Sequence, residues 1–309
     1  MKKLPIEATV AAAYKFFFQN IISIIGTVWL PTLLFLALAA GCVAAIVPHA
    51  WLSGNFVLPD DPQAFFRDRI VVIAIAVPLL AFAGLVIGAM VRVGILRLAL
   101  GQTQGVTLIW FSLGSQVWRM VASVFLFLFA WIALEFTGIV VIGAVSAGFA
   151  ALNASPLVSS LGTAVLILAI LLGAFYIMLR LFFFLPAVIV AENRIGVSRA
   201  WALGQGNVLR ILVVILAVVI PIYMIAGFAL YAAVIPVVLG AAMHMAPTED
   251  AAANAAAGIA FLKSLLPLLP AFLIIELVAG IVLFGTLWGA IGKAYQAVTQ
   301  EGESCGLAG

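Results

Sequence analysis

The chain has 309 residues, of which 67% are apolar and only 8% are charged, and its formal net charge at pH 7 is +3. Soluble domains keep about a quarter of their residues charged, so this composition excludes a soluble fold and predicts an integral membrane protein. The basic residues lie in short turns beside apolar runs, which is typical of membrane topology and argues against a nucleic-acid-binding surface.

Six long apolar runs predict an all-α integral membrane protein with six transmembrane helices. About 20 apolar residues in a helix cross the hydrocarbon core, and no polar stretch in the sequence is long enough for a soluble domain. Residues 1–309 are therefore predicted to form a single polytopic membrane domain. Its spans cover residues about 21–47, 70–96, 118–148, 160–187, 208–240 and 265–291.

Residues 5–19, before the first span, predict an amphipathic helix. Apolar side chains recur there at helical spacing, and Glu7 and Lys15 lie off the apolar stripe. The stripe consists of Ile6, Val10, Ala13 and Phe17. We expect this helix to lie on the membrane surface and to remain attached, because the charges interrupt what would be the apolar core of a signal peptide.

Basic residues are divided unequally between the two ends of the predicted spans. Eleven of the fourteen Lys and Arg residues fall on the side of both termini, and three, Arg67, Arg69 and Lys263, fall on the other side. The eleven are Lys2, Lys3, Lys15, Arg92, Arg97, Arg119, Arg180, Arg194, Arg199, Arg210 and Lys293. Because Lys and Arg accumulate on the cytoplasmic side of membrane proteins, both termini are predicted to be cytoplasmic.

A loose repeat marks the start of each odd-numbered span. Asn20, Gln116 and Asn207 are 96 residues apart (116 minus 20) and then 91 apart (207 minus 116). Each follows an aromatic residue by six positions and precedes a polar residue by three. The aromatic residues are Tyr14, Trp110 and Trp201, and the polar residues are Ser23, Arg119 and Arg210. This spacing indicates three tandem units, each a surface helix followed by two spans. Within each unit we expect the amide to cap or orient the helix entry and the aromatic ring to lie at the headgroup level.

Residues 180–210 resemble the membrane domain that accompanies some bacterial glycerophosphoryl diester phosphodiesterases and related uncharacterised six-span inner-membrane proteins. The residues that match this pattern are Arg180, Pro186, Ala187, Glu192, Trp201, Leu203, Gly206 and Arg210. The chain departs from the pattern at Ala200, where the family usually has Ser. The resemblance implies a multi-pass protein of the bacterial inner membrane. It does not imply phosphodiesterase activity, since the sequence contains no soluble domain to carry that chemistry.

Two acidic residues fall inside predicted spans, Glu135 in the third and Glu276 in the sixth. An acid at the centre of a membrane helix costs about 2.5–3.5 kcal/mol on insertion scales. With a rise of about 1.5 Å per residue, both acids are expected between the midplane and the outer leaflet, where they would pair if their helices touch. One interpretation is a proton or cation relay, and the other is a protonated Glu that hydrogen-bonds across helices as a structural contact.

Several basic and aromatic residues are candidates for lipid or phosphate contacts. These are Arg92, Arg119, Arg180, Arg199, Trp201 and Arg210. Arg suits bidentate contacts with phosphate, so a headgroup or substrate-phosphate site is one interpretation. The alternative is that the long cationic side chains extend to the membrane interface and that their positions reflect topology alone.

No enzyme or metal motif appears in the sequence. GxSxG, HExxH, P-loop and dinucleotide fingerprints are absent, and His244 has no second ligand at metal spacing. Cys42 and Cys305 do not form a disulfide framework or a zinc site, and no cofactor is expected.

We therefore predict a non-enzymatic membrane protein that organises or senses the bilayer or a partner protein. The alternative is a small transporter or channel with Glu135 and Glu276 as intramembrane proton or cation sites. Expected partners are membrane lipids, and a partner membrane protein or a second copy of the chain.

Overall fold

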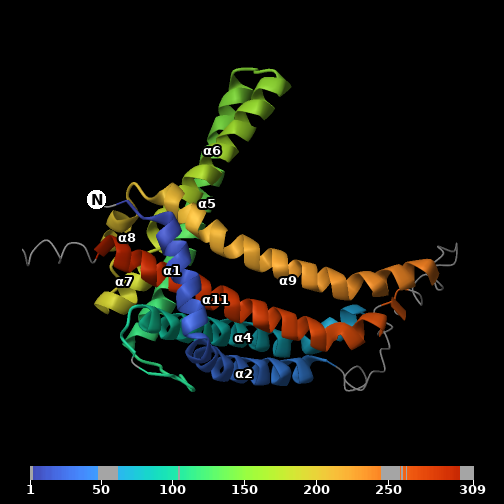
Figure 1. Cartoon of the computed structure of the whole chain (residues 1–309). Coiled ribbons are helices and arrows are strands. Elements are labelled where there is room, and N and C mark those ends of the chain that lie inside the picture. The colour runs from blue at the N-terminus through green and yellow to red at the C-terminus, as the bar shows by residue number, and fades with distance from the viewer. Residues whose placement is uncertain are drawn as a thin grey trace, which may run out of the picture.

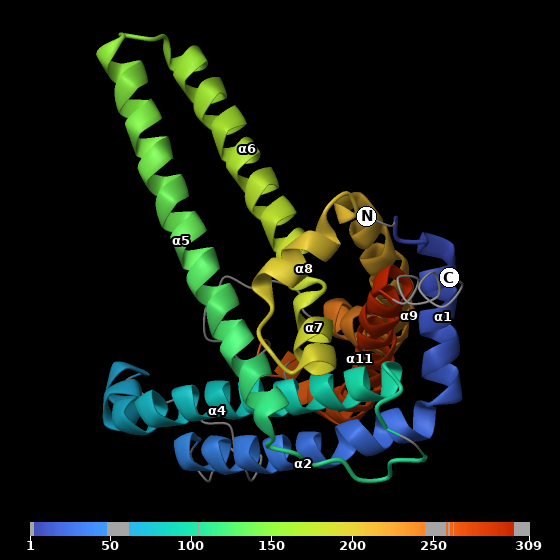
Figure 2. The same ribbon diagram turned by 90° about the vertical axis from the view of Figure 1, so that its left-hand side faces the viewer.

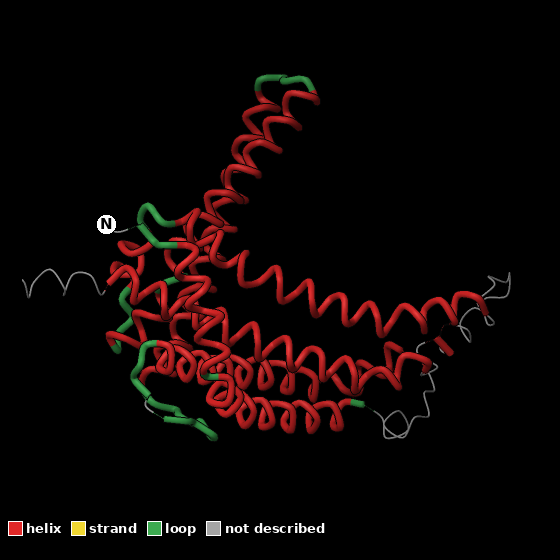
Figure 3. Tube along the Cα trace, viewed as in Figure 1, coloured by secondary structure: helices red, strands yellow, loops and turns green. Residues whose placement is uncertain are grey.

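The computed structural model describes residues 3–47, 62–103, 105–244, 258, 260–261 and 263–299. Within these residues the chain is helical and contains no strand (Figures 1 and 3). The helices are α1 (Ile6–Gln19), α2 (Ile21–Ile46), α4 (Pro62–Ala99), α5 (Ser115–Ala151), α6 (Pro156–Phe182), α7 (Leu185–Glu192), α8 (Val197–Gly204), α9 (Val208–His244) and α11 (Leu269–Thr299), the last preceded by a 3-10 turn, η1 (Leu266–Leu268).

The prediction of six spans is confirmed, since six helices are long and apolar enough to cross a membrane. The fourth candidate span covers Pro156–Glu192 and so includes the predicted end at residue 187, but its helix is interrupted at residues 183–184, between α6 and α7. Pro186 lies in the first turn of the new helix α7. Proline has no backbone N–H, and none is needed there, because N–H groups of a first helical turn have no partner within the helix. Residues 185–190 of α7 are buried, so this segment is part of the core.

The spans pack as three consecutive pairs, α2 with α4, α5 with α6, and α9 with α11. Helices α2, α4, α9 and α11 run side by side, whereas the α5–α6 hairpin projects away from them (Figures 1 and 2). All six meet at one end, where α2, α5 and α9 begin and α4, α6 and α11 finish. We call this the convergent end.

Helix α7 lies inside the convergent end and is buried along most of its length (Figure 2). It packs against α4, α5, α8 and α11, and its buried residues are Leu185, Pro186, Ala187, Val188, Ile189 and Val190. Gln102 Nε2 and Gln116 Nε2 both donate to the carbonyl oxygen of Val190, at 3.3 and 2.9 Å. Asn193 ends the helix in the left-handed region, with φ of 49°.

The amphipathic helix predicted before the first span is present as α1, but its inner face contacts protein. It lies across α9 and α11 at the convergent end (Figure 1), with Glu7 and Lys15 exposed. A methyl group on Gly289 would lie 2.5 Å from Phe16 Cδ1, and one on Gly285 would lie 2.7 Å from Phe17 Cδ2. Glycines of α11 thus admit the two rings of α1 (Phe16 and Phe17), while Glu7, Lys15 and Phe18 stay exposed. The position of α1 on the membrane surface stays a prediction.

The three-unit repeat is visible in the first and third units. Asn20 Nδ2 donates to the Phe16 carbonyl at the end of α1, and Asn207 Nδ2 donates to the Leu203 carbonyl at the end of α8. Each amide therefore bonds the carbonyl end of the surface helix that precedes its span. The prediction placed the amide at the entry of the span instead, and the Asn20 side chain makes no cap bond to α2. The second unit has no surface helix, because residues 105–114 form an extended linker (Figure 3).

Replacing Gly289 with Ala should destabilise the fold by about 1–3 kcal/mol, because the new methyl group overlaps the Phe16 ring. Gly280→Ala is the matched control in the same helix, since no heavy atom lies within 4 Å of a methyl group there. Thermal unfolding in one detergent should give a lower Tm for Gly289→Ala than for Gly280→Ala. Equal Tm values would contradict the docking of α1 on this face of α11.

Candidate functional site

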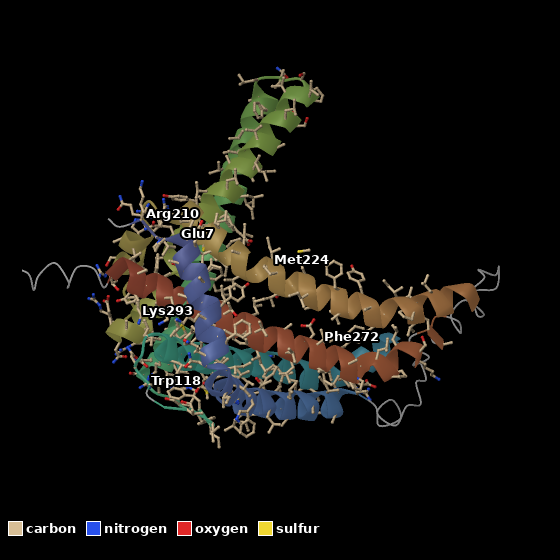
Figure 4. All side chains as sticks on the ribbon, in the orientation of Figure 1. Glu7, Trp118, Arg210, Met224, Phe272 and Lys293 are labelled. Atoms are coloured by element: carbon tan, nitrogen blue, oxygen red, sulfur yellow. The ribbon has the colours of Figure 1, made fainter. Side chains whose placement is uncertain are left out.

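Positive charge accumulates at the convergent end. Ten described Lys and Arg residues lie there, against two described carboxylates, Glu7 and Glu192. The ten are Lys3, Lys15, Arg92, Arg97, Arg119, Arg180, Arg194, Arg199, Arg210 and Lys293. Figure 4 labels Arg210 and Lys293 at this end, and Met224 and Phe272 farther along the spans. Such an excess of cations attracts anions from outside the protein, except where carboxylates or carbonyl oxygens of the protein already pair with the cations.

Three of the arginines stack on tryptophan rings. The guanidinium carbon of Arg92 lies 5.3 Å from the centre of the Trp288 ring, and that of Arg97 lies 5.2 Å from the Trp110 ring. These contacts join α4 to α11 and to the linker before α5. Cation–π contacts of this kind hold a guanidinium by its face and leave its edge free to donate hydrogen bonds.

The third stacked pair, Arg180 and Trp201, is the closest, with 3.9 Å between the guanidinium carbon and the ring centre. Arg180 Nε also donates to the Trp201 carbonyl at 3.3 Å, and Nη1 donates to the Tyr176 hydroxyl at 3.4 Å. Gly204 packs directly on the backbone of Arg180, so α8 lies close against the end of α6. The structure thus brings together two of the predicted lipid or phosphate contacts.

Two of the stacked pairs contain buried N–H groups without an acceptor. Among the described residues, the buried side-chain nitrogens that lack a hydrogen-bond partner are Arg92 Nε, Arg97 Nε, Trp110 Nε1, Arg119 Nη1 and Trp288 Nε1. Each of these nitrogens is a donor. Arg92 and Arg97 lie on α4, and Trp110 lies on the linker after it. Arg119 lies on α5 and Trp288 on α11, and both of these helices contact α4. A buried donor left unpaired costs about 1–3 kcal/mol. We call this set of donors, which is spread over α4, the linker after it, α5 and α11, the arginine–tryptophan layer.

Several other cations at the convergent end are already engaged by protein. Arg194 Nη2 lies 2.6 Å from Glu192 Oε2, and Arg199 Nε lies 3.5 Å from Glu192 Oε1. The Tyr295 hydroxyl donates to the same Glu192 Oε1 at 3.2 Å, which ties α11 to the end of α7. Lys293 Nζ donates to the Ala99 carbonyl at 2.9 Å and so stabilises the carbonyl end of α4.

Arg210, a predicted lipid contact, also has a protein partner. Its Nη1 donates to the Leu4 carbonyl at 2.8 Å, and Asn207 Oδ1 accepts the Leu4 N–H at 2.9 Å. Both backbone groups of the fully buried Leu4 are therefore held by the start of α9. Among the predicted lipid or phosphate contacts, Arg92 and Arg119 keep unpaired donors, whereas Arg180, Arg199 and Arg210 have protein partners.

The two acids predicted inside spans lie apart from this layer and from each other. Glu135 Oε1 accepts the Trp131 indole N–H at 2.6 Å, and Glu135 lines a cavity of about 240 Å³ between α5 and α6. Glu276 lies exposed on α11 and makes no hydrogen bond with the described residues. Because α5 diverges from α11 beyond the convergent end (Figures 1 and 2), the structure does not bring the two carboxyl groups together.

Sequence reasoning missed Arg97, Trp110 and Trp288 as members of the layer. Arg97 lies at the end of an apolar run, five residues after Arg92, and this position could have suggested it. Trp288 is 196 residues beyond Arg92 (288 minus 92), and only the packing of α11 on α4 reveals that they stack. Among the described residues no group of three or more His, Cys, Asp or Glu is placed to hold a metal ion.

Comparison of the chain with models of protein families, with curated proteins and with solved structures finds no match. The resemblance of residues 180–210 to the phosphodiesterase-associated membrane domain therefore rests on those residues alone. In the structure they form the end of α6, the helices α7 and α8, and the start of α9.

Asn207→Ala should release the N-terminal segment, because the Leu4 N–H loses its acceptor while it is buried. A net hydrogen bond of about 1 kcal/mol predicts roughly five- to tenfold faster hydrogen exchange of the Leu4 amide. Asn20→Ala is the matched control, since Asn20 bonds only the opposite end of α1. If both variants leave Leu4 exchange at the wild-type rate, the anchoring of Leu4 by Asn207 is disproved.

Proposed function

We propose that this protein is a non-enzymatic, multi-pass protein of the bacterial inner membrane that binds anionic phosphate-bearing lipid headgroups and thereby organises or senses the bilayer. The binding site in this proposal is the arginine–tryptophan layer at the convergent end. Both termini are assigned to the cytoplasm, which the excess of Lys and Arg on that side supports. The bacterial inner membrane is supported by the resemblance of residues 180–210.

The observation that carries the proposal is the set of buried donors without acceptors on Arg92, Arg97, Arg119, Trp110 and Trp288. A phosphate diester offers several acceptor oxygens and a negative charge, and a guanidinium binds such a group through paired N–H bonds. The described carboxylates at this end do not satisfy the layer: Glu192 is paired with Arg194 and Arg199. The layer is therefore complementary to an anion from outside the protein.

The position of these arginines suits a lipid better than a ligand from solution. Arg97 lies in the last turn of α4, and Arg92 lies five residues earlier, about 7.5 Å deeper along the span. A phosphate at the membrane surface meets Arg97 first, and the glycerol region below it reaches the depth of Arg92. The stacked rings of Trp110 and Trp288 suit this interfacial depth, where tryptophan is enriched.

Arg97→Gln is expected to weaken phosphatidylglycerol binding by about tenfold, because one charge-assisted contact of about 1.4 kcal/mol is lost. Delipidated protein titrated with phosphatidylglycerol in a mild detergent, read by native mass spectrometry, measures this change. Arg67→Gln is the charge-matched control, since Arg67 is exposed at the other end of α4 beside Asp68.

Arg97→Lys should fall between wild type and Arg97→Gln, because it keeps the charge and loses the planar pair of donors. Equal weakening by Arg67→Gln and Arg97→Gln would show that only net charge matters and would reject the layer as a specific site. Unchanged binding in Arg92→Gln and Arg97→Gln together would reject the proposal.

A transporter or channel is the second candidate function, and the position of Glu135 favours it. Glu135 is a carboxyl group in the wall of a largely apolar cavity between two spans, held by the Trp131 indole. A carboxyl group in such surroundings exchanges a proton or binds a cation only when a path reaches it. Glu276, on the outer surface of α11, would act as a separate site in this mechanism.

Glu135→Gln should abolish proton-driven acidification in proteoliposomes if this second function is correct, because the amide does not exchange a proton in this pH range. The same assay on Glu276→Gln tests whether the second acid contributes independently. Wild-type protein with no flux above empty vesicles, or unchanged flux in the double variant, would remove the transporter from consideration.

A further inference from the structure

The linker between α4 and α5 carries an apolar surface that the proposed function does not use. From residue 98 to residue 118 the sequence has no Asp, Glu, Lys or Arg, and Arg97 and Arg119 flank this stretch. Residues 105–114 form no regular helix. Five large apolar side chains of the linker are exposed, namely Val106 (68%), Leu108 (66%), Ile109 (62%), Phe111 (55%) and Leu113 (48%).

The opposite side of the linker is fixed to α2. Gly26 leaves room for the Thr107 carbonyl, because a side chain there would overlap this oxygen. Ser23 Oγ accepts the Thr107 N–H at 3.2 Å, and the Trp29 indole donates to the Leu108 carbonyl at 2.8 Å. The linker therefore follows the first turns of α2 in a defined position, and its exposed apolar side chains are held outward.

Trp110 secures the linker on α4. A methyl group on Gly94 would lie 2.9 Å from Trp110 Nε1, so the indole occupies the space that this glycine leaves. The same ring stacks on Arg97. Trp110 thus points inward while its neighbours Ile109 and Phe111 are exposed, which gives the linker one anchored side and one free side.

The free side continues the lipid-facing surface of α2 and α5. Next to the linker on α2, Ile22 and Ile25 are exposed, and at the start of α5 Trp118 is exposed. On α1, Phe18 is also exposed, at 68%. Since α2 and α5 are candidate spans, the side chains that extend their apolar surfaces lie against the same bilayer.

We propose that linker 105–113 is an interfacial anchor that inserts its apolar side chains into the boundary between headgroups and acyl chains on the convergent-end side of the membrane. The extended backbone of the linker lacks the internal hydrogen bonds that a helix makes between its N–H and C=O groups. Backbone groups without such bonds are not tolerated in the hydrocarbon centre. Five exposed apolar side chains are equally unfavourable in water. The boundary region satisfies both requirements, because water and headgroups reach the backbone there while acyl chains surround the side chains.

A nitroxide at Ile109 tests the anchor. In a chain with Cys42 and Cys305 replaced by Ala, the label is introduced as Ile109→Cys in vesicles of phosphatidylethanolamine and phosphatidylglycerol. Its collision rates with oxygen, which concentrates in the bilayer, and with a water-soluble nickel chelate report its depth. Ser198→Cys on the exposed face of α8 serves as the aqueous reference, and Leu33→Cys on the exposed face of α2 serves as the hydrocarbon reference.

The anchor predicts that the label at Ile109 collides with nickel several-fold less often than the label at Ser198. It predicts an oxygen rate above that at Ser198 and below that at Leu33. A nickel rate equal to that at Ser198 would overturn the proposal by placing the linker in water. Low rates with both reagents would overturn it in favour of a covering protein, either a partner or a second copy.

A second variant separates insertion from misfolding. With the label moved to Leu108→Cys, Ile109→Asp should raise the nickel rate several-fold, and Ile109→Leu should leave it unchanged. A label at Ser198 in the Ile109→Asp background should keep its rates, which shows that the convergent end is intact. No change on Ile109→Asp would overturn the anchor. None of these readouts depends on lipid headgroup binding by the arginine–tryptophan layer.

Discussion

Helix α7 is surrounded by protein, so the carbonyl groups at its end must find donors other than bulk water. Gln102 and Gln116 supply them at Val190, and they come from the two ends of the linker that joins α4 to α5. Glu192, two residues further on, is joined to α11 through Tyr295. The hydrogen bonds at the end of α7 thereby fix the positions of α4, α5 and α11 at the convergent end.

Several cations of that end are paired within the protein. Arg194, Arg199, Arg210 and Lys293 bond carboxylates or backbone carbonyls, and Arg180 stacks on Trp201. The arginine–tryptophan layer differs, because its buried N–H groups have no acceptor among the described residues. Native structures pair most buried polar groups, and the proposed phosphate ligand would supply acceptors to these donors.

The three units enter their spans in different ways. In the first and third units a surface helix precedes the first span. These helices, α1 and α8, pack on other helices of the convergent end. The second unit enters through linker 105–113, whose apolar side chains face outward. Away from the convergent end the α5–α6 hairpin stands apart from the other four spans, and its contacts with them are made near its base (Figure 2).

Composition and periodicity were sufficient to predict the six spans and the helix α1, because about 20 apolar residues in a row have few stable arrangements outside a membrane. The repeat placed Asn20 and Asn207 at helix boundaries, but it did not predict that their amides bond the carbonyl ends of the preceding helices. The tertiary structure alone decided that α6 breaks at Phe182, that α1 docks on Gly285 and Gly289, and that Arg92 stacks on Trp288. Each of these three features depends on contacts between segments far apart in the chain, and a local sequence pattern does not indicate which helices contact each other.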